Sequence, residues 1–95
     1  MNNDAEKIIG ALVLNEADNV AVCLRDIAKN STVTVKRSDG GTFTIAALNA
    51  IDTGHKIALL DLPQGVKVTK YAEIIGTMTR DASRGEHVHI HNLSD

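Results

Sequence analysis

The chain has 95 residues with a formal net charge of −2, and 43% of them are hydrophobic, which predicts one globular domain over residues 1–95. Only 2% are aromatic and no basic run occurs, so the cationic and stacking surface of a nucleic-acid-binding protein is missing. No segment is apolar enough for a membrane span or a signal peptide, and we therefore expect a cytoplasmic protein.

The first 14 residues form either an N-terminal strand or an extension. Asp4 could cap a short helix, but residues 8–14, with the sequence Ile-Ile-Gly-Ala-Leu-Val-Leu, favour a buried strand.

Seven further segments are typical of strands. They are residues 20–24, 32–36, 42–48, 56–60, 66–70, 75–79 and 86–91. The second and third flank Ser38-Asp39-Gly40-Gly41, which is a hairpin signal. Many short strands separated by glycine-containing turns predict a mostly β fold of bent hairpins with little helix.

A repeated unit organises the chain: an apolar strand, an aspartate, a short turn and a second strand. The aligned sets are Asp26, Asn30 and Val33; Asp61, Gly65 and Val68; and Asp81, Gly85 and Val88. We expect each aspartate to cap its own turn through backbone N–H groups just ahead of it. The Asn or Gly four residues later is expected to be left-handed, and the valine to start a strand. This pattern favours a structural role for the aspartates over a catalytic one.

The concentrated chemistry lies near the C-terminus, in Gly85-Glu-His-Val-His-Ile-His-Asn92. On a strand, His87, His89 and His91 would point to one face, and Val88 and Ile90 would anchor the other in the core.

The histidine row suits either metal binding or proton transfer. A His-x-His pair such as His87 and His89 can bind one metal ion, whereas binding all three histidines to one ion is harder because His91 is far from His87 along a strand. Further ligands must come from elsewhere, and His55 is a candidate, although it could equally be an exposed histidine at a strand entry. General acid–base catalysis and a purely structural polar face are the alternatives that the sequence leaves open.

Several motifs resemble the SAF-type (β-clip) domain of the altronate and galactarate dehydratase family. They are Ala17-Asp-Asn-Val-Ala-Val-Cys-Leu-Arg-Asp-Ile27, Gly54-His-Lys-Ile-Ala-Leu-Leu-Asp61, Tyr71-Ala-Glu-Ile-Ile-Gly76 and Gly85-Glu-His-Val-His-Ile-His-Asn-Leu93. The same domain occurs as the separate small subunit of related lyases such as sulfolactate sulfo-lyase. Two positions depart from the family, because Asn30 and Ala72 stand where glycine is usual.

The resemblance implies a β-clip fold and a place in a metal-dependent hydro-lyase, usually ferrous, that dehydrates a sugar acid such as altronate or galactarate. It implies catalytic roles for His87, His89 and His91, metal ligation by His87 and His89, and substrate binding by His55 and Asn92. The chain would be the small subunit or N-terminal domain beside a large catalytic partner, with little activity alone. The alternative is a non-catalytic sugar-acid-binding or assembly module, and exposed strand edges make a homo-oligomer possible.

Overall fold

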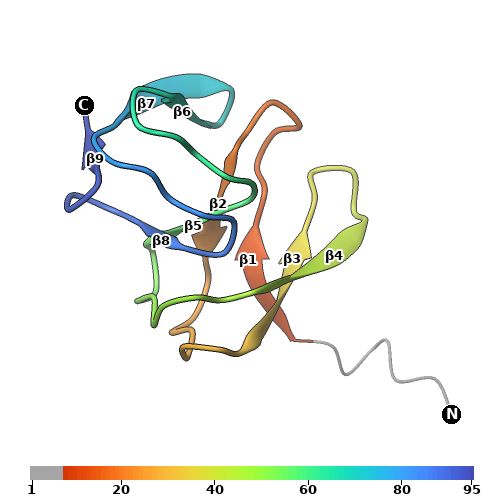
Figure 1. Ribbon diagram of the computed structural model, residues 1–95. Coiled ribbons are helices and arrows are strands. Elements are labelled where there is room, and N and C mark those ends of the chain that lie inside the picture. Colours follow the sequence, from red (N-terminus) through yellow and green to blue (C-terminus); the bar gives the residue numbers. More distant parts are fainter. Residues whose placement is uncertain (1–7) are drawn as a thin grey trace, which may run out of the picture.

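The computed structural model describes residues 8–95, which form nine strands and no helix (Figure 1). The strands are β1 (Ile9–Leu12), β2 (Val20–Cys23), β3 (Thr32–Lys36), β4 (Thr42–Ala46), β5 (Lys56–Ala58), β6 (Lys67–Lys70), β7 (Glu73–Met78), β8 (His87–Val88) and β9 (Leu93–Ser94). The predicted mostly β fold is confirmed. Within these residues nothing resembles a long apolar helix that could cross a membrane. The helix-capping role considered for Asp4 lies outside the described residues.

Two curled sheets make up the fold (Figure 1). The larger has the strand order β4-β3-β1-β2-β5-β8, and the smaller has the order β6-β7-β9. Only the β1–β3 pair among these strands is parallel. The hairpin predicted around Gly40 is confirmed, with β3 and β4 paired from Thr32↔Ala46 to Lys36↔Thr42.

Several predicted strand ends were wrong. The strands expected over residues 42–48 and 56–60 end earlier, at Ala46 and Ala58, and the strand expected over residues 75–79 already begins at Glu73. Strand β9 was not predicted, because Leu93-Ser94 is too short to carry an alternating pattern.

The turn aspartates bond across the molecule, which corrects the expectation that each would cap its own turn. Asp61 accepts a hydrogen bond from the N–H of Arg84 (2.9 Å), and Asp81 accepts one from the N–H of Gln64 (2.8 Å). The aspartate of the second turn therefore binds the main chain of the third turn, and the aspartate of the third turn binds the main chain of the second. The sequence does not distinguish an aspartate that caps its own turn from one that binds a different turn, because both arrangements need a carboxylate acceptor at the same position.

The first turn of the repeat pairs with a fourth turn, which was not predicted from the sequence, and here the side-chain hydrogen bonds run in one direction only. Asp26 accepts hydrogen bonds from the N–H and hydroxyl of Thr53, and Ile27 forms an isolated bridge with Ile51. The equivalent bridge between the second and third turns joins Leu62 and Ala82. The fourth turn does not match the sequence repeat, because Ala50 occupies the position of the aspartate.

The remaining repeat predictions are confirmed, apart from the exact start of each strand. Asn30, Gly65 and Gly85 have φ angles of 68°, 88° and 90°. The three aligned valines are buried, with exposed fractions of 3% or less, but each is the second residue of its strand rather than the first.

The apolar interior forms two clusters, one for each half of the fold. Both clusters receive residues from β2 and β5, which alternate between them along each strand. Strands β2 and β5 thus contribute side chains to both apolar clusters and connect the two halves of the fold.

Asp18 and Asn19 fasten the smaller sheet to the larger one. The Asn19 side chain accepts a hydrogen bond from the Thr69 N–H (2.8 Å) and donates one to the Lys67 carbonyl (2.9 Å). Asp18, 8% exposed, accepts hydrogen bonds from the N–H groups of Tyr71 (3.0 Å) and Ala72 (2.9 Å). These two hairpin residues have φ angles of 58° and 62°, so Ala72 adopts the left-handed conformation for which glycine is usual.

Candidate functional site

Strand pairing brings two distant histidines together. His87 lies in β8 and pairs with Ile57 of β5, while His55 immediately precedes β5. The Nδ1 atom of His55 is 2.9 Å from the Nε2 atom of His87, a hydrogen-bond distance. The main chain of His87 is itself anchored, because its N–H donates to the Asn49 side chain (2.9 Å).

The predicted histidine strand over residues 86–91 is only partly correct. It ends at Val88, and a turn follows in which the N–H groups of Asn92 and Leu93 both donate to the His89 carbonyl. Val88 is buried as predicted, but Ile90 is 85% exposed and anchors nothing in the core of the described chain. Once the chain turns at His89, the alternation of a strand no longer applies.

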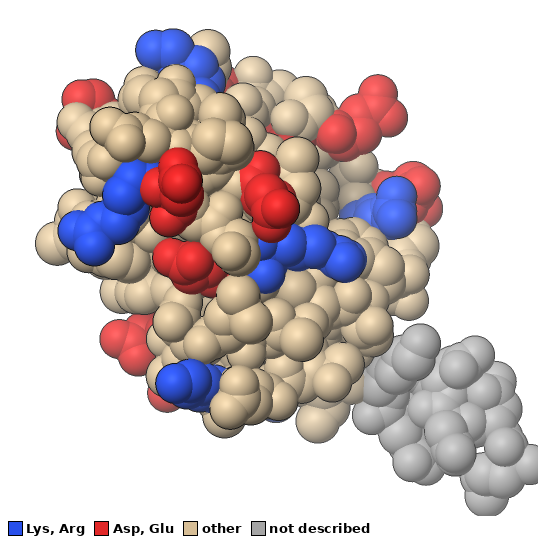
Figure 2. Space-filling model, in the orientation of Figure 1, with Lys and Arg blue, Asp and Glu red and all other residues tan. Residues whose placement is uncertain are grey.

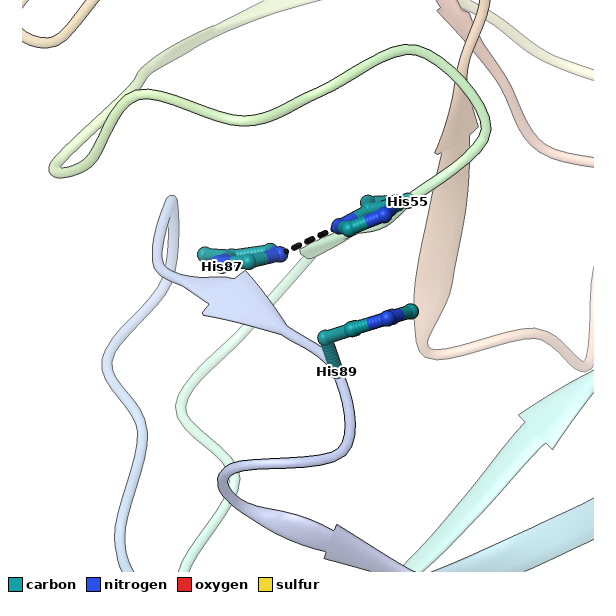
Figure 3. Close-up of side chains that lie close together, drawn as sticks. All are labelled: His55, His87 and His89. Carbon is teal, nitrogen blue, oxygen red and sulfur yellow. Dashed lines mark hydrogen bonds between the residues drawn. The ribbon is translucent and has the colours of Figure 1, made fainter.

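The turn brings His89 back under His55. Their ring centroids are 3.7 Å apart with an interplanar angle of 11°. Figure 3 shows the rings of His55 and His87 directed toward each other, with His89 in a parallel plane beside them. Each of the three histidines offers one nitrogen, and these nitrogens all lie within 4.8 Å of one another. We call His55, His87 and His89 the histidine cluster.

His91 lies outside the histidine cluster. Its ring is exposed and tilted by 39° against that of His87, with 4.9 Å between centroids. The structure therefore joins His55, rather than His91, to the pair predicted as metal ligands.

Burial lowers the pKa of both His87 and His89 below the usual value of 6.5. The next contribution for His87 is the positive charge of a protonated His91, and for His89 that of His55. Both imidazoles are consequently neutral near pH 7. A neutral imidazole has a free nitrogen lone pair, the form that binds metals.

The donor set suits a divalent metal ion, provided that the stacked rings of His55 and His89 turn so that a nitrogen of each points at the same ion. Two nitrogens bound side by side to one ion at about 2.1 Å are themselves about 3.0 Å apart in octahedral geometry. The 2.9 Å between His55 and His87 matches that separation. In addition, the Nδ1 atom of His89 is buried without a hydrogen-bond partner among the described residues. Because buried polar atoms normally have a hydrogen-bond partner, this nitrogen is available to bind an ion.

The Asn92 side chain links the main chains of His87 and His89. Its side chain is 0% exposed, accepts a hydrogen bond from the His89 N–H and donates one to the His87 carbonyl, both at 2.9 Å. The oxygen and the nitrogen of the side-chain amide are thus both hydrogen-bonded to main-chain groups. Its role in substrate binding stays a prediction.

Lys56 lies beside the histidine cluster, although the sequence analysis did not include it among the candidate site residues. Lys56 and His89 line a hollow of about 240 Å³ together with Ile90 and the chain end at Asp95. Burial, and then the charge of Lys70, lower the pKa of Lys56. Only the adjacency of Lys56 to His55 could have signalled it, since a lone strand lysine is usually a surface residue.

The sequence of the chain is also similar to those of known proteins. The family model described as the altronate/galactarate dehydratase SAF domain matches residues 9–95. An altronate dehydratase of Escherichia coli (strain K12) is 38% identical over 79 residues, which cover 83% of this chain and 15% of that protein. The (2R)-sulfolactate sulfo-lyase subunit alpha of Paracoccus pantotrophus is 48% identical over 58 residues, which cover 61% of this chain and 87% of that protein. The chain thus spans about one seventh of the altronate dehydratase and most of the sulfo-lyase subunit.

Proposed function

Because the chain belongs to the family of SAF domains of altronate/galactarate dehydratases, we propose that it is the small subunit or N-terminal domain of a metal-dependent hydro-lyase. Its substrate would be a sugar acid such as altronate or galactarate. The relatives whose names support this substrate class are altronate dehydratases and a galactarate dehydratase.

The observation that carries the proposal is the histidine cluster. We assign metal ligation to His87 and His89, with His55 as the third nitrogen, because their donor atoms converge within 4.8 Å. Ferrous iron is the ion we favour, and imidazole ligands suit it. A divalent ion supplies a Lewis acid that polarises the carboxylate or hydroxyl group of a hydroxy acid.

Proton transfer is assigned to His91. Its imidazole is exposed and lies beside His87, so it can meet a substrate without giving up a ligand position. Dehydration needs a base for the α-proton and an acid for the departing hydroxyl group, and imidazole serves either role near neutral pH.

A large catalytic partner completes the proposal. The altronate dehydratases are several times longer than this chain, whereas the sulfo-lyase subunit is a separate small chain. We propose that the exposed side of the cluster, with Ile90 at its rim, faces this partner, and that the complex acts in the cytoplasm.

Cobalt binding tests the metal assignment. Co²⁺ bound by imidazole gives visible absorption bands, and we expect them when Co²⁺ is added to the purified full chain. His89→Ala should weaken Co²⁺ binding about tenfold or more, whereas the matched control His91→Ala should leave it unchanged.

The opposite pattern has a clear meaning. If the wild-type chain binds no Co²⁺, or if His89→Ala binds it as tightly as wild type, the metal assignment is wrong. The alternative of a non-catalytic sugar-acid-binding or assembly module would then replace it.

A further inference from the structure

The hollow beside the histidine cluster contains a lysine to which the proposed function gives no role. This hollow, of about 240 Å³, is lined by Lys56, Ile75, His89, Ile90, Leu93 and Asp95, and we call it the Lys56 hollow. Lys56 pairs with Val22 of β2 and with Val88 of β8, and directly opposed residues of antiparallel strands point to the same face of a sheet. The aliphatic part of Lys56 therefore lies between two valines, which restricts the positions that its ammonium group can reach.

The Lys56 ammonium group lacks a compensating negative charge. The side chain is half-buried, and burial and the charge of Lys70 both lower its pKa, whereas no carboxylate of residues 8–95 raises it. Asp95 lines the same hollow but is not among the charges that act on Lys56. Buried ammonium groups are usually paired with an acidic group, because burial without one costs free energy. A carboxylate from another molecule would supply this partner.

The size and the walls of the Lys56 hollow favour an amino-acid side chain over a whole sugar acid. Its volume of about 240 Å³ is below the usual range of small-molecule pockets. Ile75, Ile90 and Leu93 give it an apolar wall, against which the hydroxyl groups of a sugar acid would lose hydrogen bonds to water. Ile90 is 85% exposed and extends this apolar surface outward. An acidic side chain flanked by apolar residues matches both the charge and the wall.

The charges elsewhere on the chain also favour recognition through a single ion pair. On the face shown in Figure 2, acidic and basic side chains are interspersed and neither sign forms a continuous patch. The whole chain carries 10 Lys and Arg residues against 12 Asp and Glu residues. So balanced a charge gives little long-range attraction, and specificity for a partner then depends on local pairs.

We propose that the Lys56 hollow binds an aspartate or glutamate side chain of the large catalytic partner. The carboxylate of this side chain pairs with the Lys56 ammonium group, and the apolar residues that flank it pack on Ile90. The inference rests on the large partner of the proposed function and adds the contact by which this partner is recognised. Because His89 lines the same hollow, the contact places the partner directly beside the histidine cluster.

Calorimetric titration of the full chain with the large subunit of the dehydratase tests the proposal. Lys56→Met keeps an aliphatic stem and removes the charge, so it should raise the dissociation constant about tenfold or more. Lys56→Arg keeps the charge and should stay within about threefold of wild type. The matched control Lys29→Met, at an exposed lysine outside the hollow, should leave the dissociation constant unchanged. Added salt should weaken binding of the wild-type chain more than that of Lys56→Met.

The outcomes separate this inference from the proposed function. Binding of Lys56→Met as tight as that of wild type would overturn the inference and leave the large partner in place. Normal assembly of Lys56→Met with a raised KM for altronate or galactarate would also overturn it, because Lys56 would then bind the substrate. A wild-type chain that forms no complex would contradict the large partner itself, and the inference with it. Circular dichroism spectra report whether each variant is folded.

Discussion

At the scale of single residues, Asn92 shows how one buried side chain shapes the candidate site. The sequence presents it as the end of a histidine motif, but its amide bridges the His87 carbonyl and the His89 N–H from a fully buried position. It therefore determines where the chain bends and how His89 stacks beneath His55.

Replacing Asn92 by alanine should destabilise the chain by about 3 kcal/mol. The substitution leaves a donor and an acceptor of the main chain without partners in the interior. The control is Gln64→Ala, whose side chain is exposed and which should cost less than about 0.5 kcal/mol. Urea denaturation of both variants measures the difference, and equal midpoints would contradict the structural role of Asn92.

The lowered pKa values of His87 and His89 make stability depend on pH. As the pH falls through 6.5, the unfolded chain takes up protons on these groups before the folded chain does. The contribution is therefore fully present above that value and is lost as the pH falls toward the lower pKa of the folded state. We expect the urea midpoint of the metal-free chain to fall between about pH 7.5 and pH 5.5.

His89→Gln should flatten this pH dependence, because it removes one of the two shifted groups. The comparison is made with EDTA present, so that metal binding does not add its own pH dependence. A slope as steep in His89→Gln as in wild type would show that other groups cause the effect.

At the scale of elements, the fold is held by turns that pair two by two. Asp61 and Asp81 exchange hydrogen bonds with opposite turns, while Asp26 binds a turn whose own aspartate position is Ala50. The repeated turns thus bind one another through hydrogen bonds between segments that are distant in sequence, and they do not act as independent hairpins.

Two turn glycines with the same backbone conformation should differ in their tolerance of alanine. Gly65 and Gly85 have φ angles of 88° and 90°. A Cβ atom at Gly65 meets nothing within 4 Å among the described residues, whereas one at Gly85 would clash with the carbonyl oxygen of Ala46. Gly65→Ala should cost about 1 kcal/mol from backbone strain alone. Gly85→Ala should cost about 3 kcal/mol or more, because β4 must also move.

Thermal denaturation of the two glycine variants gives the comparison directly. Because Gly65 serves as the matched control, a similar loss in both would mean that the close approach of Ala46 to Gly85 does not exist in solution.

At the scale of the whole molecule, the histidine cluster lies at the surface of residues 8–95, beside an open hollow. The adjoining hollow measures about 240 Å³, below the usual range of small-molecule pockets. Ile90, at the rim of this hollow, is 85% exposed. A surface of this kind gains from a partner that buries it.

We therefore expect the purified chain to show no measurable dehydration of altronate or galactarate, even with Fe²⁺ present. Co-expression with a large dehydratase subunit should give turnover, measured by the 2-keto product. The matched control is the same complex with His89→Ala, which should assemble but lose activity about a hundredfold. Substantial turnover by the isolated chain would contradict the need for a partner.

Much of this architecture could be predicted from local pattern. The left-handed positions at Asn30, Gly65 and Gly85 follow from residue type, and Val33, Val68 and Val88 are buried where their register placed them. The histidine cluster was predicted in part: the pair was identified and His55 was a candidate third ligand. The exclusion of His91 was also predicted, but from a distance along a straight strand, whereas the chain turns at His89 and leaves the His91 ring only 4.9 Å from that of His87.

What the sequence by itself determined is therefore whatever a few neighbouring residues control: β composition, turn positions, the hairpin around Gly40 and the concentration of imidazoles near the C-terminus. Only the tertiary structure decided which turns exchange hydrogen bonds, that Ile90 faces outward, and that His55 stacks on His89 from 34 residues away. The physical reason is that the side chains of a strand alternate by local geometry, whereas contacts between distant segments depend on how the sheets close on each other.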